Sequence, residues 1–245
     1  MGLEWLDVRP GEAVVSPMFG TAHVVVLALL GLLAAALILS RRALRGVTLA
    51  NPILRGLSAF VLADQLLLFG LYFVWDYQPF WERFPLHLCA GLSLFVPSCV
   101  LLRKLEPLRY VAPWCVGAGF ISVVNLSLAT NHWYEYVFVH YVWMHFYLFA
   151  LPSVLVISGQ IRLSYRLLWI SSGILFCISA VIFALDWALD ANWMYIGPHS
   201  SLEIPFLPVA FTEWPWSYPT FIGVCLLLFQ VVYLCLRPLR PRSAD

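Results

Sequence analysis

The chain has 245 residues, of which 62% are hydrophobic and 11% charged, with a formal net charge of +1 and a mean hydropathy of +0.86. Soluble domains are about 45–50% apolar and about 25% charged, so this composition argues against a soluble enzyme or a disordered protein. The near-zero net charge removes any electrostatic argument for binding DNA or RNA, and no nucleic-acid partner is expected. The remaining class is an integral multi-pass membrane protein, whose partners are membrane lipids.

Seven apolar segments are long enough to form transmembrane helices, which need about 20 residues to cross a hydrocarbon core of about 30 Å. They lie at about 21–40, 57–75, 85–102, 109–129, 134–158, 165–185 and 219–236. Continuous apolar runs argue against barrel strands, which are about 10 residues long and alternate in polarity. The sequence therefore predicts an all-α polytopic bundle of about seven transmembrane helices in a single domain, 1–245, with one long connection at 186–218.

The basic residues predict the orientation of this bundle, because cytoplasmic loops carry an excess of Lys and Arg. All basic residues except Arg9 and Arg83 lie between spans one and two, three and four, or five and six, or in the C-terminal tail. The N-terminus is therefore expected outside and the C-terminus in the cytoplasm. The connection 186–218, rich in Trp, Tyr and Pro, is then an outer loop that forms an interfacial belt or a lid over the bundle.

Polar side chains inside these spans gather at one level of the bundle. Such groups are expensive in a membrane and usually face the bundle interior or a wet cavity. The predicted orientation places near the outer ends of the helices His23, His87, Cys89, Asn125, His140, His145, Asp186 and Asn192. The inner half holds few such groups, and Asp64 and Gln65 lie nearer mid-membrane. We therefore expect a hydrophilic pocket open to the outer half of the bilayer.

Cys89 is the cysteine that this pocket singles out. The six cysteines are scattered through the spans without CxxC pairs, and a thiol buried in lipid usually acts as a small apolar side chain. A base from another helix can convert a thiol into a nucleophile. His87 is two residues away and points to the opposite face, so we expect His140 or His145 on span five to act on Cys89. From the starts of their spans, Cys89 lies about 6 Å deep and His145 about 16 Å deep, so contact requires an earlier start of span three or tilted helices.

Neither a metal nor an organic cofactor is expected. Two histidines that share a metal on one helix are usually four residues apart, whereas His140 and His145 are separated by five. The sequence has no HExxH motif and no cluster of acidic residues. The metal alternative that remains is a cross-helix site formed by His23, His87 and one histidine of span five.

Several short motifs occur in a specific order over nearly the whole chain. They are Phe19-Gly-Thr-Ala-His23, Arg83-Phe-Pro-Leu-His87-Leu-Cys89 followed by Ser93 and Pro97, the span-five histidine, Asn192-Trp-Met-Tyr195 and Trp214-Pro-Trp216-Ser-Tyr218. This combination resembles the bacterial YwaF-like family of integral membrane proteins, in which His145 is the best match to the span-five histidine. The family is related to a eukaryotic transmembrane phospholipid acyltransferase that uses Cys and His, and distantly to androgen-induced fatty-acid-ester hydrolases that use Thr and His.

The resemblance implies that Cys89 is an acyl-accepting nucleophile and His145 its general base, in a bacterial cytoplasmic membrane. Thiolate attack on a lipid ester gives an acyl-thioester, which a lysolipid hydroxyl accepts in transfer and water cleaves in hydrolysis. His145 takes and returns the proton. The other candidates line the site or donate hydrogen bonds to the tetrahedral oxyanion; they are His23, His87, Asn125, His140 and Asn192.

Two other functional classes remain as alternatives. One is a small-solute or lipid transporter or binding protein without covalent chemistry, which predicts polar groups through both halves of the membrane. The other is an assembly subunit without chemistry, in which no single cysteine reacts faster than the rest. The nearly dry inner half favours the lipid acyltransferase or lipid ester hydrolase.

Overall fold

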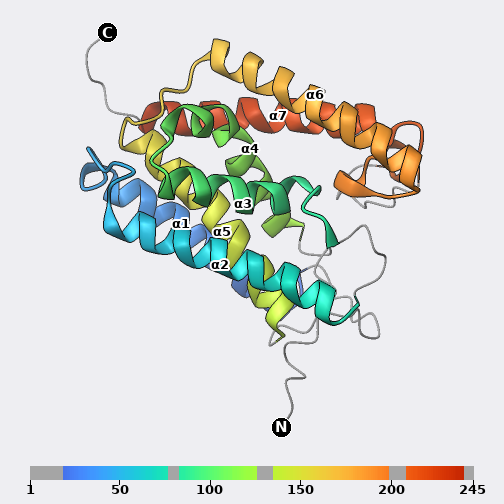
Figure 1. The fold of residues 1–245 in the computed structure, drawn as a ribbon. Coiled ribbons are helices and arrows are strands. Elements are labelled where there is room, and N and C mark those ends of the chain that lie inside the picture. Colours follow the sequence, from blue (N-terminus) through green and yellow to red (C-terminus); the bar gives the residue numbers. More distant parts are fainter. Residues whose placement is uncertain (1–18, 77–82, 126–134, 199–207, 240–245) are drawn as a thin grey trace.

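The computed structural model describes residues 19–76, 83–125, 135–198 and 208–239, and within these segments it contains helices and no strand. The α-helices are α1 (Thr21–Leu39), α2 (Pro52–Val74), α3 (Leu88–Leu101), α4 (Leu105–Val124), α5 (Tyr136–Ile157), α6 (Tyr165–Leu189) and α7 (Ser217–Leu236). Short 3-10 turns lie at Ser40–Arg42, Trp193–Tyr195, Val209–Phe211 and Arg237–Leu239. The expected all-α bundle is confirmed for the part of the chain described (Figure 1).

Six of these helices are long and apolar enough to cross a membrane, which makes the chain an integral multi-pass membrane protein. The remaining helix, α3, has 14 residues and rises about 21 Å at about 1.5 Å per residue. It is shorter than the predicted span 85–102 because His87 has extended backbone angles (φ −64°, ψ 139°) and the helix begins only at Leu88.

The other boundaries differ from the predicted spans by at most a few residues. α2 begins at Pro52 rather than at 57, because the Asn51 side chain accepts hydrogen bonds from the amides of Ile53 (2.9 Å) and Leu54 (3.2 Å). Proline at the first helical position favours the same start. α4 begins at Leu105 and ends before 129, and α6 continues past 185 into the predicted outer loop.

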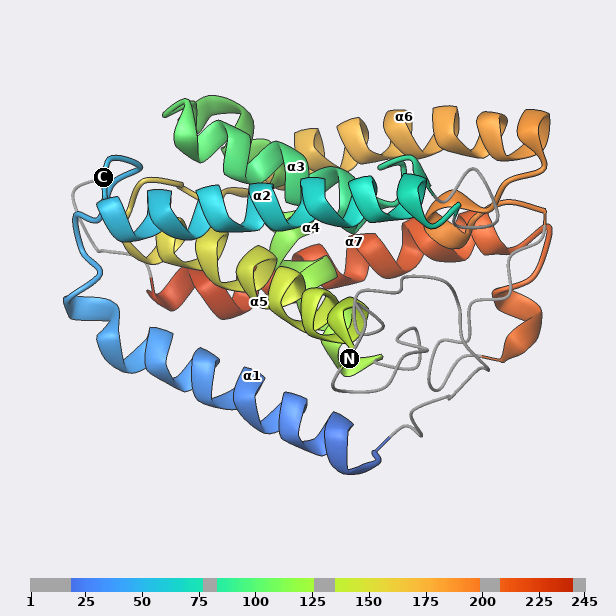
Figure 2. The same cartoon turned by 60° about the horizontal axis from the view of Figure 1, so that its bottom comes forward.

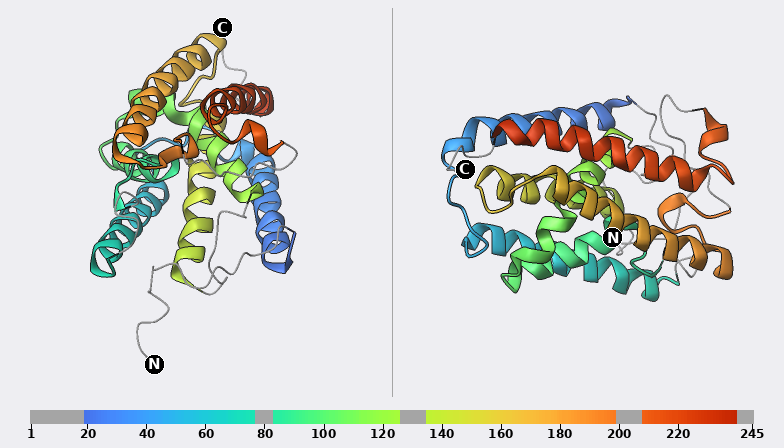
Figure 3. Two further views of the ribbon diagram at one scale, coloured as in Figure 1. Left: turned by 90° about the vertical axis from the view of Figure 1, so that its right-hand side faces the viewer. Right: turned by 90° about the horizontal axis from the view of Figure 1, so that it is seen from above.

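α4 and α5 lie at the centre of the bundle, and the other helices pack around them (Figures 1 and 3). In both central helices 67% of the most apolar 18-residue stretch is buried inside the protein. The corresponding share is 17% for the stretch that includes α1 and 22% for α2. α1 lies along one edge of the bundle, well separated from α6 (Figure 2). The outer helices direct large apolar side chains away from the protein, among them Leu32, Phe60 and Trp169, as lipid-facing surfaces require.

Gly119 brings the two central helices unusually close together. A Cβ atom at this position would lie 2.7 Å from the carbonyl oxygen of His145 and 2.8 Å from the amide nitrogen of Phe149. Small residues allow the backbones of membrane helices to approach in this way. The contact fixes the backbone of His145 against α4.

Polar side chains gather at one end of the bundle, where α2, α4 and α6 end and α3, α5 and α7 begin. His87, Asn125, His140 and Asp186 all belong to this end. Apart from Arg83, the basic residues in the described segments follow or precede helices at the opposite end, as Arg41, Arg103, Arg162 and Arg237 do. The separation of polar and basic residues expected from the sequence is therefore present in the fold.

Candidate functional site

A cavity of about 300 Å³ lies within the polar end of the bundle, bounded by α2, α3, α4, α5 and α7. The 3-10 turn Trp193–Tyr195 adds Met194 and Tyr195 to its wall. Most of the lining is apolar; its polar or reactive side chains include Gln65, His87, Cys89, Trp114, Ser122, Asn125, His140, Tyr141, His145, Thr220 and Cys225. A mostly apolar cavity with a few converging polar groups is typical of sites that bind small molecules.

The cavity brings together Cys89, His145, His87, Asn125 and His140, five of the residues singled out from the sequence. The two other candidates, His23 and Asn192, lie outside the lining found among the described residues. α1 packs at the edge of the bundle, where His23 stacks on Phe19 and its Nδ1 accepts a hydrogen bond from the Phe19 amide (2.9 Å). Asn192 precedes the 3-10 turn, whose later residues reach the cavity instead.

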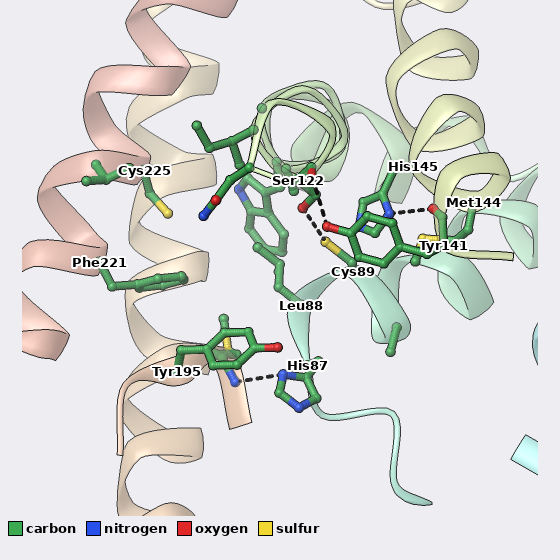
Figure 4. Close-up of a pocket in the computed structure, with 18 of the residues that line it drawn as sticks. His87, Leu88, Cys89, Ser122, Tyr141, Met144, His145, Tyr195, Phe221 and Cys225 are labelled. Carbon is green, nitrogen blue, oxygen red and sulfur yellow. Dashed lines mark hydrogen bonds between the residues drawn. The ribbon is translucent and has the colours of Figure 1, made fainter. Parts of the chain in front are cut away.

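Cys89 is linked to His145 through Ser122 of α4 and Tyr141 of α5. Its Sγ lies 3.8 Å from the Ser122 hydroxyl oxygen on α4. The Tyr141 hydroxyl donates to the Ser122 carbonyl oxygen (2.8 Å), and the rings of Tyr141 and His145 pack with centroids 4.2 Å apart. Among the described residues no hydrogen bond joins Cys89 directly to His145 (Figure 4). The helices thus place thiol and imidazole in one cavity with Ser122 and Tyr141 between them.

His145 is buried and its tautomer is defined by one contact. Its Nδ1 lies 2.7 Å from the carbonyl oxygen of Tyr141, one turn earlier on α5. A carbonyl oxygen accepts hydrogen bonds and cannot donate, so Nδ1 carries the proton and Nε2 of the neutral ring holds a lone pair. Nε2 is therefore the nitrogen that can accept a proton.

His140 is paired with an acid that the sequence left without a partner. Its Nδ1 lies 2.7 Å from Asp64 Oδ2 on α2. The Tyr136 hydroxyl donates to Asp64 Oδ1 (2.9 Å) and to the Asp64 carbonyl oxygen (3.0 Å). The sequence does hold a signal for this pair, because an acidic residue in an apolar span usually pairs with another group inside the bundle.

Trp114 of α4 contributes a donor that sequence reasoning missed. Its side chain lines the cavity and is 3% exposed. Within the described segments its buried Nε1 has no hydrogen-bond partner. A buried N–H group without a partner is unfavourable by about 1–3 kcal/mol, so a carbonyl group that came within reach of this nitrogen would stabilise it.

A second thiol, that of Cys225 on α7, also lines the cavity. Figure 4 shows Cys225 and Phe221 on one side of the cavity, with Cys89, Tyr141 and His145 on the other. Sequence reasoning passed over Cys225 because no histidine lies near it in the chain. Its position makes it the natural alternative nucleophile in any test of Cys89.

The first part of the predicted outer loop forms one wall of the cavity. Asp186 Oδ1 accepts a hydrogen bond from the Trp193 amide (2.8 Å), which holds the 3-10 turn against the end of α6. The Met194 amide donates to His87 Nδ1 (3.2 Å), and the rings of His87 and Tyr195 lie 5.1 Å apart. The loop is thereby joined to the start of α3, next to Cys89.

The histidines do not form a metal centre with other ligands in the described part of the chain. No group of three or more His, Cys, Asp or Glu side chains there is arranged to hold a metal ion. The cross-helix alternative required His23, which does not share the cavity with His87.

A protein-family model matches residues 18–233, a range that includes the whole cavity. The chain belongs to the TMEM164 family. Members of this family are membrane proteins, in agreement with the six long apolar helices. The comparisons with curated proteins and with solved structures gave no match.

Proposed function

We propose that this member of the TMEM164 family is a membrane-embedded lipid acyltransferase or lipid ester hydrolase, with Cys89 as nucleophile and His145 as general base. The observation that carries the proposal is that a thiol and a histidine with a proton-accepting Nε2 line one mostly apolar cavity. The apolar lining suits an acyl chain, and the polar groups suit an ester. The resemblance of the motifs around both residues to YwaF-like proteins and their acyltransferase relatives supports the same chemistry.

The reaction has two halves joined by a thioester. His145 takes the thiol proton, the sulfur of Cys89 attacks the ester carbonyl, and the lysolipid leaves with that proton while the acyl group stays on sulfur. A hydroxyl group or water then releases the acyl group. Catalytic hydrogen bonds are often long without substrate and tighten in the substrate complex. We propose that Ser122 and Tyr141 hold thiol and imidazole apart until an ester enters.

The developing oxyanion needs hydrogen-bond donors at the reacting carbonyl. Trp114 is the first candidate, since its side chain lines the cavity and its buried Nε1 has no partner among the described residues. Asn125, where α4 ends, also lines the cavity and is a second candidate donor. His87 already accepts a hydrogen bond through Nδ1, which leaves Nε2 as its donor.

We also propose that the cavity opens toward the outer half of the bilayer of a bacterial cytoplasmic membrane. All the described basic residues except Arg83 lie at the other end of the bundle, and an excess of such residues marks the cytoplasmic side. The N-terminus is then outside and the C-terminus inside.

The test is acyl transfer by purified protein in vesicles of phosphatidylcholine with a radiolabelled acyl chain, with a lysophospholipid as acceptor. Cys89→Ala is expected to lower turnover by at least about 10³-fold, because the step that forms the thioester is lost. Cys177→Ala, at an exposed position on α6, is the matched control and keeps wild-type turnover. Cys225→Ala tests the other thiol: loss in that variant together with full activity of Cys89→Ala would overturn the proposal.

A further inference from the structure

We propose that His140 is a second catalytic base, positioned by Asp64, which activates the hydroxyl acceptor after His145 has activated Cys89. This inference rests on the proposed function and divides its two halves between two histidines of one helix. Asp64 acts through His140 and is a positioning residue.

Both imidazoles belong to the same cavity and have different partners. His140 and His145 are five residues apart on α5, which separates their directions by about 140°, and both line the cavity. His145 Nδ1 faces a peptide carbonyl oxygen, whereas His140 Nδ1 faces a carboxylate, each at 2.7 Å. In each ring Nε2 is therefore the proton acceptor.

Because the two histidines have different hydrogen-bond partners, each ring is suited to take a proton from a different acid. A peptide carbonyl oxygen fixes the tautomer of His145, whereas a carboxylate also stabilises the imidazolium that forms when the ring takes a proton. An ordinary thiol has a pKa of about 8.5, and water, like an alcohol, is a far weaker acid. The acceptor thus needs the base whose positive charge is stabilised, and the thiol does not.

Packing alone gives no reason for the Asp64–His140 pair. The carboxylate sits in the middle of an apolar helix with its side chain 13% exposed, where an ionisable group is expensive and usually functional. The Tyr136 hydroxyl holds the second carboxylate oxygen, so the acid is oriented from both sides. Such a fixed acid, bonded to a histidine in a cavity wall, is the arrangement that orients a general base.

The proposed step starts from the acyl group on Cys89. An acceptor hydroxyl gives its proton to His140 Nε2 while its oxygen bonds to the thioester carbonyl carbon. The carbon–sulfur bond then breaks, and its electron pair leaves on sulfur as a thiolate, which departs without prior protonation. His140 then gives the proton that it took from the acceptor to that thiolate, so the products are the new ester and the free thiol.

The experiment follows both halves in the full-length protein in phosphatidylcholine vesicles with a radiolabelled acyl chain and added lysophospholipid. Label bound to Cys89 measures thioester formation, and labelled product measures transfer. His140→Gln is expected to lower transfer by about 10²-fold or more while labelled protein accumulates. His145→Gln is expected to lose both, because the thiol is never activated. Asp64→Asn is expected to lower transfer at least about tenfold, again with accumulation.

Treatment with hydroxylamine distinguishes a variant that has lost its general base from one whose fold is damaged. It attacks thioesters at neutral pH as a free amine and needs no general base, so in His140→Gln it should restore release of the acyl group to the wild-type rate. The matched control is His23→Gln, which removes a buried histidine outside the cavity and is expected to keep both halves within about twofold.

The outcomes distinguish this inference from the function on which it rests. If wild-type protein never carries label on Cys89, the proposed function fails first. If wild-type protein is labelled but His140→Gln and Asp64→Asn lower thioester formation and transfer equally, or hydroxylamine restores nothing, the function stands and His140 is not the acceptor base.

Discussion

At the scale of single residues, the proposed chemistry depends on one hydrogen-bond donor, the indole nitrogen of Trp114. This nitrogen is buried in the cavity wall and has no hydrogen-bond partner within the described segments. In a site that excludes water, a donor held in place before reaction stabilises an oxyanion without reorganising. Trp114 is therefore expected to matter more in the transition state than in substrate binding.

Trp114→Phe keeps an aromatic ring and removes the N–H group. We expect kcat to fall by about 10²-fold with little change in KM, because the lost hydrogen bond strengthens only as charge develops. Trp143→Phe is the matched control, since its Nε1 is also buried without a partner among the described residues but Trp143 is not part of the cavity lining. Equal kcat values for the two variants, from steady-state kinetics in vesicles, would remove Trp114 from the mechanism.

The sequence could identify reactive side chains that lie near one end of their helices. It could not identify residues whose role depends on contacts with another helix. His140 and His145 stand out because imidazoles are rare in apolar spans, and Cys89 stands out because it lies at the same polar level as the histidines. Trp114 does not, because tryptophan is common in membrane proteins and its unmade hydrogen bond exists only in the packed bundle. The partner of Asp64 depends on how α2 faces α5, which no periodicity in the chain specifies.

At the scale of helices, the contact at Gly119 determines where α5 presents His145. Gly119→Ala places a methyl group against two backbone atoms of α5, so the helices must separate. We expect a loss of about 1–3 kcal/mol in stability, seen as a lower thermal midpoint in vesicles, together with reduced turnover.

The control for this change is Gly173→Ala on α6, where an added Cβ meets nothing within 4 Å. That variant is expected to be as stable as the parent or slightly more stable, because alanine reduces the freedom of the unfolded chain. If the two variants have the same midpoint, the close approach of α4 and α5 does not contribute to stability.

Cys89 and His145 share a cavity although they lie at different distances from the starts of their helices. Cys89 is the second residue of α3, whereas His145 lies about 14 Å along α5 from its first residue. α3 begins after the extended His87, later than predicted rather than earlier, so the way the helices pack, and not the start of α3, brings thiol and imidazole to one cavity. Hydropathy could not predict this start, because the residues before it, Phe84-Pro-Leu86, are as apolar as the helix.

At the scale of the whole molecule, the distribution of basic residues predicts that the two termini lie on opposite sides of the membrane. Green fluorescent protein fused after Asp245 is expected to fluoresce, because it folds in the cytoplasm, and alkaline phosphatase at the same point is expected to be inactive. The reverse pattern would place the cavity in the inner half of the bilayer and contradict the proposed orientation.

The order of the helices in the described segments could be predicted because each long apolar run has only one structure that satisfies its backbone in lipid, although α3 is shorter than the span expected there. The sequence indicated only that polar side chains gather at one level of the bundle. The volume of the cavity and its lining by α7 depend on packing that hydropathy does not encode. Cys225 illustrates the difference, because nothing near it in the chain indicates that it faces the same cavity as Cys89.

The most direct test of the central claim is the mass of the peptide that contains Cys89. Wild-type protein is mixed with excess phosphatidylcholine without lysolipid, quenched rapidly in acid, digested and analysed by mass spectrometry. The proposed chemistry predicts an acyl group on Cys89 that neutral hydroxylamine removes. An unmodified Cys89 during turnover, or an acyl group on Cys225 instead, would contradict it.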